Sequence, residues 1–370
     1  MTHLPEPRRF GGTSVTDELA DLARRTTLAD ALSRPAALVE LRRALERCLQ
    51  AGDDARWRRS LAHAEDADSY RLLCEALARC IDSPLQAPGS AIVRSFAIPI
   101  VLVAAAGRPT RVPGSLSDVQ AIRALFERSH ALGPTRNFGL SNALCSLESL
   151  EAVSPVALFR AAHDLDPRAI GPSLPPAEIR LDPNREQTHL RFLVGAGVTS
   201  SDAPGFTETA ANIAGWGREF ANLLVGQLGG PGLQLLALPR PPRDLVMAPN
   251  VGRCAQLETA LSLFASNAVR RLRAAVGEPV VIVSAHDNGE IRVTLSSPFA
   301  PEMVEGYRWP LHPLDDLPSI ERTVCELFAD MRVTDVRVMP RLLEPERASA
   351  VPLYPRCDEW DALCAGPLAS

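Results

Sequence analysis

PVVIVSAHDNGEIRVTLSS, from Pro279 to Ser297, decides the fold class of the second half of the chain. Two runs rich in β-branched residues flank Asn288-Gly289, and this dipeptide is a strong hairpin signal because a type I′ turn needs positive φ at both central residues. The stretch therefore predicts two antiparallel strands. The turn also explains the polar residues beside it: neighbours on a strand point to opposite faces, so His286 and Asp287 do not orient one another as a base and its carboxylate would.

A helix and a further strand follow this hairpin. SIERTVCELFADM predicts the helix and DVRVMPR the strand, which gives the order β-β-α-β over residues 279–340. The same order is predicted over residues 176–239, and a linking helix over residues 254–276 separates the two units. We therefore expect an internal duplication within residues 172–345. The apolar run and helix upstream, after residue 90, are a candidate third copy.

The N-terminal region, residues 1–85, has helical periodicity throughout. LVELRRALERCLQAG places five residues on one stripe, and Gly52 ends the pattern; the five are Leu38, Leu41, Leu45, Cys48 and Leu49. A small layer of antiparallel helices is expected. Residues 86–171 form a mixed segment. It opens with the β-rich run AIVRSFAIPIVLVAAA, in which Pro99 indicates an edge strand or a bulge, and it includes a short helix in SNALCSLESLEAV.

The fold class predicted from these patterns is α+β. We expect a helical N-terminal layer followed by two β-β-α-β units, or three with the candidate copy, forming antiparallel or mixed sheets covered by helices. Residues 346–370 are an irregular C-terminal tail.

Composition places the chain among globular proteins and excludes several kinds of chemistry. Of the 370 residues 46% are apolar, and because none is lysine all 39 basic residues are arginine. Schiff-base chemistry on lysine and the lysine-containing P-loop are thereby excluded. A GC-rich bacterial genome explains the absence, since lysine codons are rich in A. The net charge of −5 argues against a main role on the nucleic-acid backbone.

The apolar segments and the cysteines indicate a reduced, cytoplasmic protein. FAIPIVLVAAA, from Phe96, is the longest apolar run and is too short to span a bilayer, and the first residues lack the apolar core of a signal peptide. No membrane insertion is expected. The eight cysteines form no CxxC pair and no zinc-type spacing. Cys357 and Cys364, in the tail, are the pair placed for a disulfide.

RFGGTSV, from Arg9 to Val15, resembles the amino-terminal motif of aspartate kinases, in which a buried strand delivers a lysine and glycine N–H groups approach phosphate. Here arginine stands at the lysine position, and MTHLPEPR upstream predicts no strand. A helix start explains the residues better, with Ser14 or Thr16 as its cap and Asp17 placed as in a capping box. We predict no catalytic residue, no cofactor and no metal ligand.

EGYRWPLHPLDDLP, from Glu305 to Pro318, has the composition of a contact surface. Tyr307, Arg308 and Trp309 belong to residue types enriched at binding hot spots, and flanking prolines stiffen the segment. These three residues are the candidate interface. The alternative is that Trp309 closes the core of the second unit.

Three classes of function follow. The favoured one is a soluble bacterial scaffold or assembly protein that is not an enzyme and acts through contacts with other proteins, as a homo-oligomer or a subunit of a complex. The second is an enzyme whose site assembles from distant residues, with Arg191, Arg240 or Arg337 holding an anionic substrate. The third is a nucleic-acid-associated component, for which three arginine clusters would have to share one face: Arg24 with Arg25, Arg58 with Arg59, and Arg270 with Arg271 and Arg273.

Overall fold

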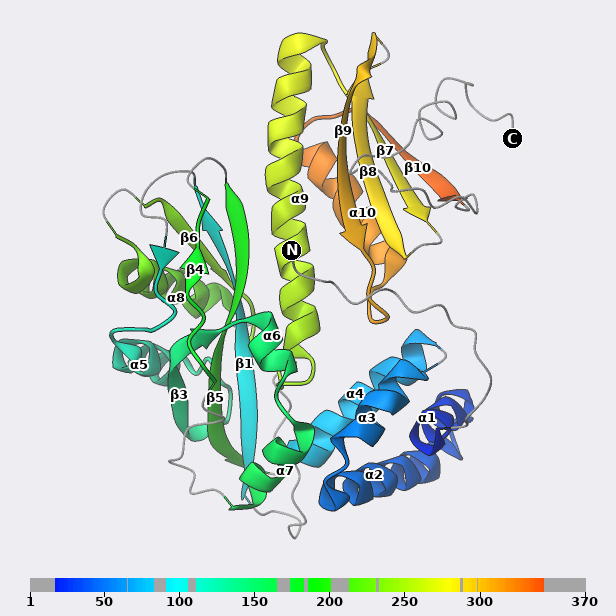
Figure 1. Ribbon diagram of the computed structural model, residues 1–370, viewed down its shortest axis with the longest axis vertical. Coiled ribbons are helices and arrows are strands. Elements are labelled where there is room, and N and C mark those ends of the chain that lie inside the picture. Colours follow the sequence, from blue (N-terminus) through cyan, green and yellow to red (C-terminus); the bar gives the residue numbers. More distant parts are fainter. Residues whose placement is uncertain are drawn as a thin grey trace. The chain divides into compact units, whose positions relative to one another are not determined.

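The structure is a computed structural model that describes residues 17–64, 66–82, 91–105, 111–164, 174–182, 186–200, 213–230, 233–286, 289–297 and 299–342. These residues form two compact units that divide within one helix, between Gln256 and Leu257 (Figure 1). The segment boundaries expected near residues 86 and 172 both fall inside the N-terminal unit. The fold is α+β, as the sequence predicts.

The N-terminal unit begins with a layer of helices. In the described residues these are α1 (Glu18–Leu28), α2 (Arg34–Ala51), α3 (Asp54–Ala62) and α4 (Ala67–Asp82). The predicted core stripe of α2 is confirmed for Leu41, Leu45, Cys48 and Leu49, which are buried, whereas Leu38 is only partly buried. Gly52 ends α2 with a φ of 78°, a left-handed conformation that glycine adopts without a steric cost.

An antiparallel sheet of four strands packs against this layer. Its strands in spatial order are β3 (Arg136–Cys145), β5 (Gln187–Ser200), β1 (Ala91–Ala104) and β6 (Leu235–Pro239). Side chains alternate between the two faces of β1. Ala97 and Val101 pack with the helical layer, whereas Phe96, Ile98 and Ile100 enter a second core. That second core is closed by α5 (Val119–Ser129) and α8 (Ile213–Leu228).

Shorter elements complete the N-terminal unit. They are α6 (Leu147–Glu151), α7 (Pro155–Asp164) and the paired two-residue strands β2 (Arg111–Val112) and β4 (Ile179–Arg180). The helix expected in SNALCSLESLEAV is wrong for its first half, because those residues finish β3. β3 and β5 pair with two register shifts, so the strand is too irregular to give a period-two pattern.

Pro99 lies in a central strand, so the expectation of an edge strand is wrong. β1 has β5 on one side and β6 on the other. Arg240 N donates to Pro99 O at 2.8 Å, and proline has no N–H to return the second bond of the pair. Regular pairing of β1 with β6 ends between Ile100 and Pro239 and resumes between Ala97 and Arg243, one residue out of register. The missing donor therefore lies at a bulge, which is the other position that the sequence predicted, and the ladder with β5 stays intact.

The C-terminal unit is a mixed sheet covered by helices on one face. Its strands in spatial order are β10 (Asp335–Leu342), β7 (Val280–His286), β8 (Glu290–Ser297) and β9 (Ala300–Pro310). β7, β8 and β9 form an antiparallel meander, and β10 is parallel to β7. The core holds Val283 and Val293 of the sheet with Leu261 and Leu272 of α9 (Ala248–Ala275) and Phe328 of α10 (Leu317–Asp330).

The two predicted β-β-α-β units differ in strand pairing and in the order of their elements. β7 and β8 form the predicted hairpin, with Gly289 at a φ of 80°, while Asn288 lies outside the described residues. In the earlier region β4 pairs with β2, whereas β5 pairs with β1 and β3. A further strand, β9, stands between β8 and α10 where a loop was expected, so the second unit has the order β-β-β-α-β. The two regions therefore share neither the full order of elements nor a topology.

Candidate protein-contact surface

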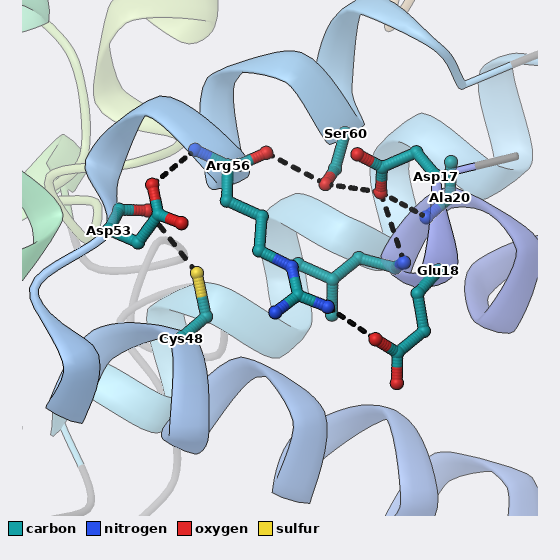
Figure 2. Close-up of polar contacts among 8 residues, drawn as sticks. Asp17, Glu18, Ala20, Cys48, Asp53, Arg56 and Ser60 are labelled. Atoms are coloured by element: carbon teal, nitrogen blue, oxygen red, sulfur yellow. Dashed lines mark hydrogen bonds and ion pairs between the residues drawn. The ribbon is translucent and has the colours of Figure 1, made fainter. Parts of the chain in front are cut away.

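The start of α1 is tied to α3 by a polar network (Figure 2). Asp17 caps α1, because its Oδ1 accepts hydrogen bonds from Leu19 N at 3.0 Å and Ala20 N at 3.4 Å. Ser60 Oγ of α3 donates to the same oxygen at 2.7 Å, and Arg56 of α3 forms an ion pair with Glu18. The cap is thus Asp17, while Ser14 and Thr16 lie outside the described residues.

The network continues to the end of α2. Asp53 Oδ1 accepts from Arg56 N at 2.9 Å, and Cys48 Sγ of α2 donates to Asp53 O at 3.3 Å (Figure 2). Burial raises the pKa of the Cys48 thiol, which keeps it protonated as the donor. The start of α1 and the end of α2 are therefore both fixed against α3.

The turn between α1 and α2 is organised by one carboxylate. Asp30 Oδ1 accepts from Leu32 N at 3.0 Å, from Ser33 N at 2.8 Å and from Ser33 Oγ at 2.8 Å. The hydrogen bond from Ser33 N–H is the main cause that holds the pKa of Asp30 below its usual value. α2 then begins with Pro35 in its first turn, where proline needs no N–H partner. Leu32 is held in this ordered turn with 93% of its surface exposed.

Exposed apolar side chains continue from this turn along one side of α2. Leu32, Pro35, Ala36 and Val39 are all exposed, and their spacing of three or four residues places them on one stripe. At 100° per residue this stripe lies opposite the buried side that carries Leu41, Leu45 and Cys48. We call these four residues the α2 stripe. Leu28, at the end of α1, is 76% exposed beside the same turn.

Among the described residues, three of the six large exposed apolar side chains, Leu28, Leu32 and Val39, lie at the α1–α2 turn and on α2. The other large exposed ones, Leu236, Phe299 and Val338, lie in β6, in the β8–β9 turn and in β10. Single apolar residues on a surface are normal, whereas contiguous ones on an ordered element mark contact surfaces. The arrangement fits an interface with another protein.

The candidate interface predicted from the sequence lies on β9. Trp309 is 1% exposed in the core of the C-terminal unit, and Tyr307 OH donates to Leu257 O at 3.0 Å from the same face. Arg308 lies on the opposite face, opposite Arg292 of β8, and its Nε is 3.8 Å from Glu290 Oε1. The structure therefore separates the three residues between two faces of one sheet. A partner contact by this segment stays a prediction.

The arginines proposed to hold a substrate come from both units. The Arg191 guanidinium donates to the carbonyl oxygens of Ala177, Leu190 and Glu178. Arg337, in the C-terminal unit, forms two hydrogen bonds of 2.7 Å with Asp335. Arg240 follows β6 in the N-terminal unit. Each of Arg191 and Arg337 thus has a structural role that occupies its side chain.

A buried carboxylate also lines a cavity, but the cavity is small. Burial raises the pKa of Asp244, whose Oδ1 accepts from Val246 N at 3.0 Å and Met247 N at 2.9 Å. Asp244, Ser95, Leu158 and their neighbours line a cavity of about 10 Å³. That volume suits one water molecule and no organic substrate. Asp244 is accordingly a structural group at the start of α9.

The histidines, the tail cysteines and the arginine clusters are the other residues that could take part in chemistry or binding. His189 is partly buried in β5, and this burial lowers its pKa to about 4. No group of three His, Cys, Asp or Glu side chains suited to a metal ion occurs among the described residues. Cys357 and Cys364 lie outside them. Of the arginine cluster on α9, Arg271 pairs with Glu305 and Arg273 with Glu278.

Among the described residues, no helix has both the length and the apolar character needed to cross a bilayer.

The sequence contains a signal for the α2 stripe that the predictions did not use. In SRPAALVELRRAL the apolar residues fall on two sides of a helix, and only one of these sides matches the core.

Comparison with protein-family models, with curated proteins and with solved structures finds no match to this chain.

Proposed function

We propose that the protein is a non-catalytic assembly protein that contacts another protein through the α2 stripe. The observation that carries this proposal is the pair of opposed apolar sides on α2, one buried in the helical layer and one exposed on an ordered helix. A helix with a single partner needs one apolar side. The second side is explained by a second partner.

The geometry of the stripe suits a helix as that partner. Leu32 and Val39 stand about two turns apart, and the smaller side chains of Pro35 and Ala36 lie between them, so the surface has two ridges with a shallow region in the middle. Full burial of a Leu or Val side chain contributes about 1.5–3 kcal/mol. The Asp30 hydrogen bonds hold Leu32 in place before binding, so less conformational entropy is lost on contact.

The test uses Leu32→Asp in the tagged full-length chain, expressed in its native host. We expect wild type to be recovered with a stoichiometric protein partner, a second copy included, and Leu32→Asp to be recovered alone, because a charge replaces an apolar contact. Complexes are measured by size-exclusion chromatography with light scattering and identified by mass spectrometry.

Phe299→Asp is the matched control for this test. Phe299 is 88% exposed, so the change introduces the same charge at an equally accessible apolar residue away from α2. Both variants should melt within about 1 °C of wild type because neither side chain packs in a core. Recovery of the same complex with Leu32→Asp as with wild type would contradict the proposal.

A further inference from the structure

We infer that the partner of the α2 stripe is the α2 stripe of a second copy of this chain, packed antiparallel across a two-fold axis. This inference rests on the proposed function and names its partner. A two-fold interface uses the same surface twice, so that surface must be complementary to itself. The α2 stripe meets this condition in shape and in charge.

The shape is complementary about a point between Pro35 and Ala36. Antiparallel pairing about that point sets Leu32 of each copy level with Val39 of the other. The two larger side chains then lie at either end of the contact. Pro35 and Ala36 meet near the axis, where their small side chains allow the helices to approach closely.

The charges next to the stripe are complementary in the same pairing. Arg43 is exposed one turn beyond Val39, on the same side of α2. The antiparallel arrangement brings it beside the turn of the second copy that carries Asp30. The hydrogen bonds to the Asp30 carboxylate all go to Oδ1, and the residue is exposed, so Oδ2 is available to an arginine. Arg43 itself makes no ion pair or side-chain hydrogen bond with the described residues.

Parallel pairing lacks both kinds of complementarity. If the two α2 helices were parallel and in register, Arg43 would lie beside Arg43 and Asp30 beside Asp30, and like charges repel at such distances. It would also set Leu32 opposite Leu32 and Val39 opposite Val39, so that no large side chain faces a smaller one. The charges therefore select the antiparallel arrangement.

The size of the stripe sets the strength of the contact. Stable dimers bury about 800 Å² on each partner, and four residues over about two turns of helix fall below that value. We expect a weak dimer with a dissociation constant in the micromolar range, so that the oligomeric state depends on protein concentration.

Two measurements on the full-length chain test the inference. Sedimentation velocity from about 1 to 200 µM should show wild type passing from monomer to dimer, and Leu32→Asp remaining monomeric. Asp30→Asn keeps an acceptor oxygen for the turn but removes the charge, and we expect it to weaken dimerisation about fivefold in low salt, with a smaller effect at 0.5 M salt. A wild-type chain that stays monomeric at 200 µM would overturn the inference.

Cross-linking tests the antiparallel geometry independently. Ala36→Cys should give a disulfide-linked dimer on mild oxidation because the two residues meet near the axis. Gln50→Cys, exposed on the same side of α2 but about 21 Å from the axis, should not. Linked dimers from both variants would indicate parallel pairing and would contradict the inference. If wild type is monomeric while Leu32→Asp still loses a different protein partner, the second-copy inference fails and the proposed function stands.

Discussion

Asp30 holds the turn between α1 and α2 through one carboxylate oxygen, and its titration is linked to the stability of that turn. Hydrogen bonds from the N–H groups of Ser33 and Leu32 lower the pKa of Asp30 in the folded protein. A carboxyl group whose folded pKa lies below its unfolded value stabilises the fold above the unfolded pKa, about 3.9 for aspartate. That contribution disappears as the pH falls through the folded pKa.

We therefore expect Asp30→Ala to lower the melting temperature at pH 7 and to have a smaller effect at pH 3, where the wild-type carboxyl is protonated. Asp30→Asn should stay closer to wild type at pH 7, because its amide oxygen still accepts from Ser33 N. Thermal melts of the three proteins at the two pH values measure this. An Asp30→Ala effect of equal size at both pH values would show that the charge on Asp30 does not contribute.

At the scale of elements, a glycine sets how closely α9 approaches β5. A Cβ added to Gly252 would lie 2.8 Å from the ring of Phe192 and 2.9 Å from Leu190 Cδ1, and both of these side chains are buried in the first core. Gly226, in α8, is also helical, but a Cβ there meets nothing within 4 Å.

Gly252→Ala should consequently lower the free energy of unfolding by about 1–3 kcal/mol, because the core is overpacked. Gly226→Ala should raise it by about 0.4–1 kcal/mol, because alanine has the better helix propensity and loses less backbone entropy. Denaturant unfolding of the two variants gives both values. The same sign for both substitutions would refute the close approach of α9 to β5.

Helices and strands were predicted correctly where a single hydrophobic periodicity dominates the sequence. The core side of α2 and the β7–β8 hairpin follow from residue spacing and from Asn288-Gly289. β9 was missed because Gly306 and Pro310 are loop signals, although Thr294 and Arg292 of β8 pair with it in register.

The candidate site was harder to predict for a related reason. The α2 stripe and the core side of α2 are both apolar, and a sequence pattern alone does not say which of two apolar sides is covered. The packing of α1 and α4 against α2 decides which side is covered, and this packing depends on contacts between residues that are distant in the sequence. Trp309 presents the same ambiguity: its type suits an interface, whereas its partners in β8 and α9 place it in a core.

At the scale of the whole molecule, the division within α9 separates two sets of core residues. Leu45 belongs to the helical layer of the N-terminal unit, and Trp309 to the core of the C-terminal unit. Units with separate cores unfold as separate cooperative transitions when the contact between them is small.

We expect scanning calorimetry to show two transitions and the two core truncations to affect different ones. Trp309→Ala should destabilise one unit by about 3–5 kcal/mol and Leu45→Ala the other by about 2–5 kcal/mol, since each leaves a cavity. Each substitution should shift one transition and leave the second in place. A single transition lowered by both variants would mean that the chain unfolds as one cooperative body.

Pro99 has a consequence for how the first sheet reaches its correct alignment. Strands slip most easily by two residues, because such a slip keeps every side chain on its original face. Beyond the proline ring, Ala97 and Arg243 exchange two backbone hydrogen bonds. A two-residue slip of β6 along β1 would break that exchange and carry the ring into the interior of the ladder, where it offers no hydrogen. The ring therefore disfavours the misaligned sheet, and a Pro99→Ala chain would sample it more easily.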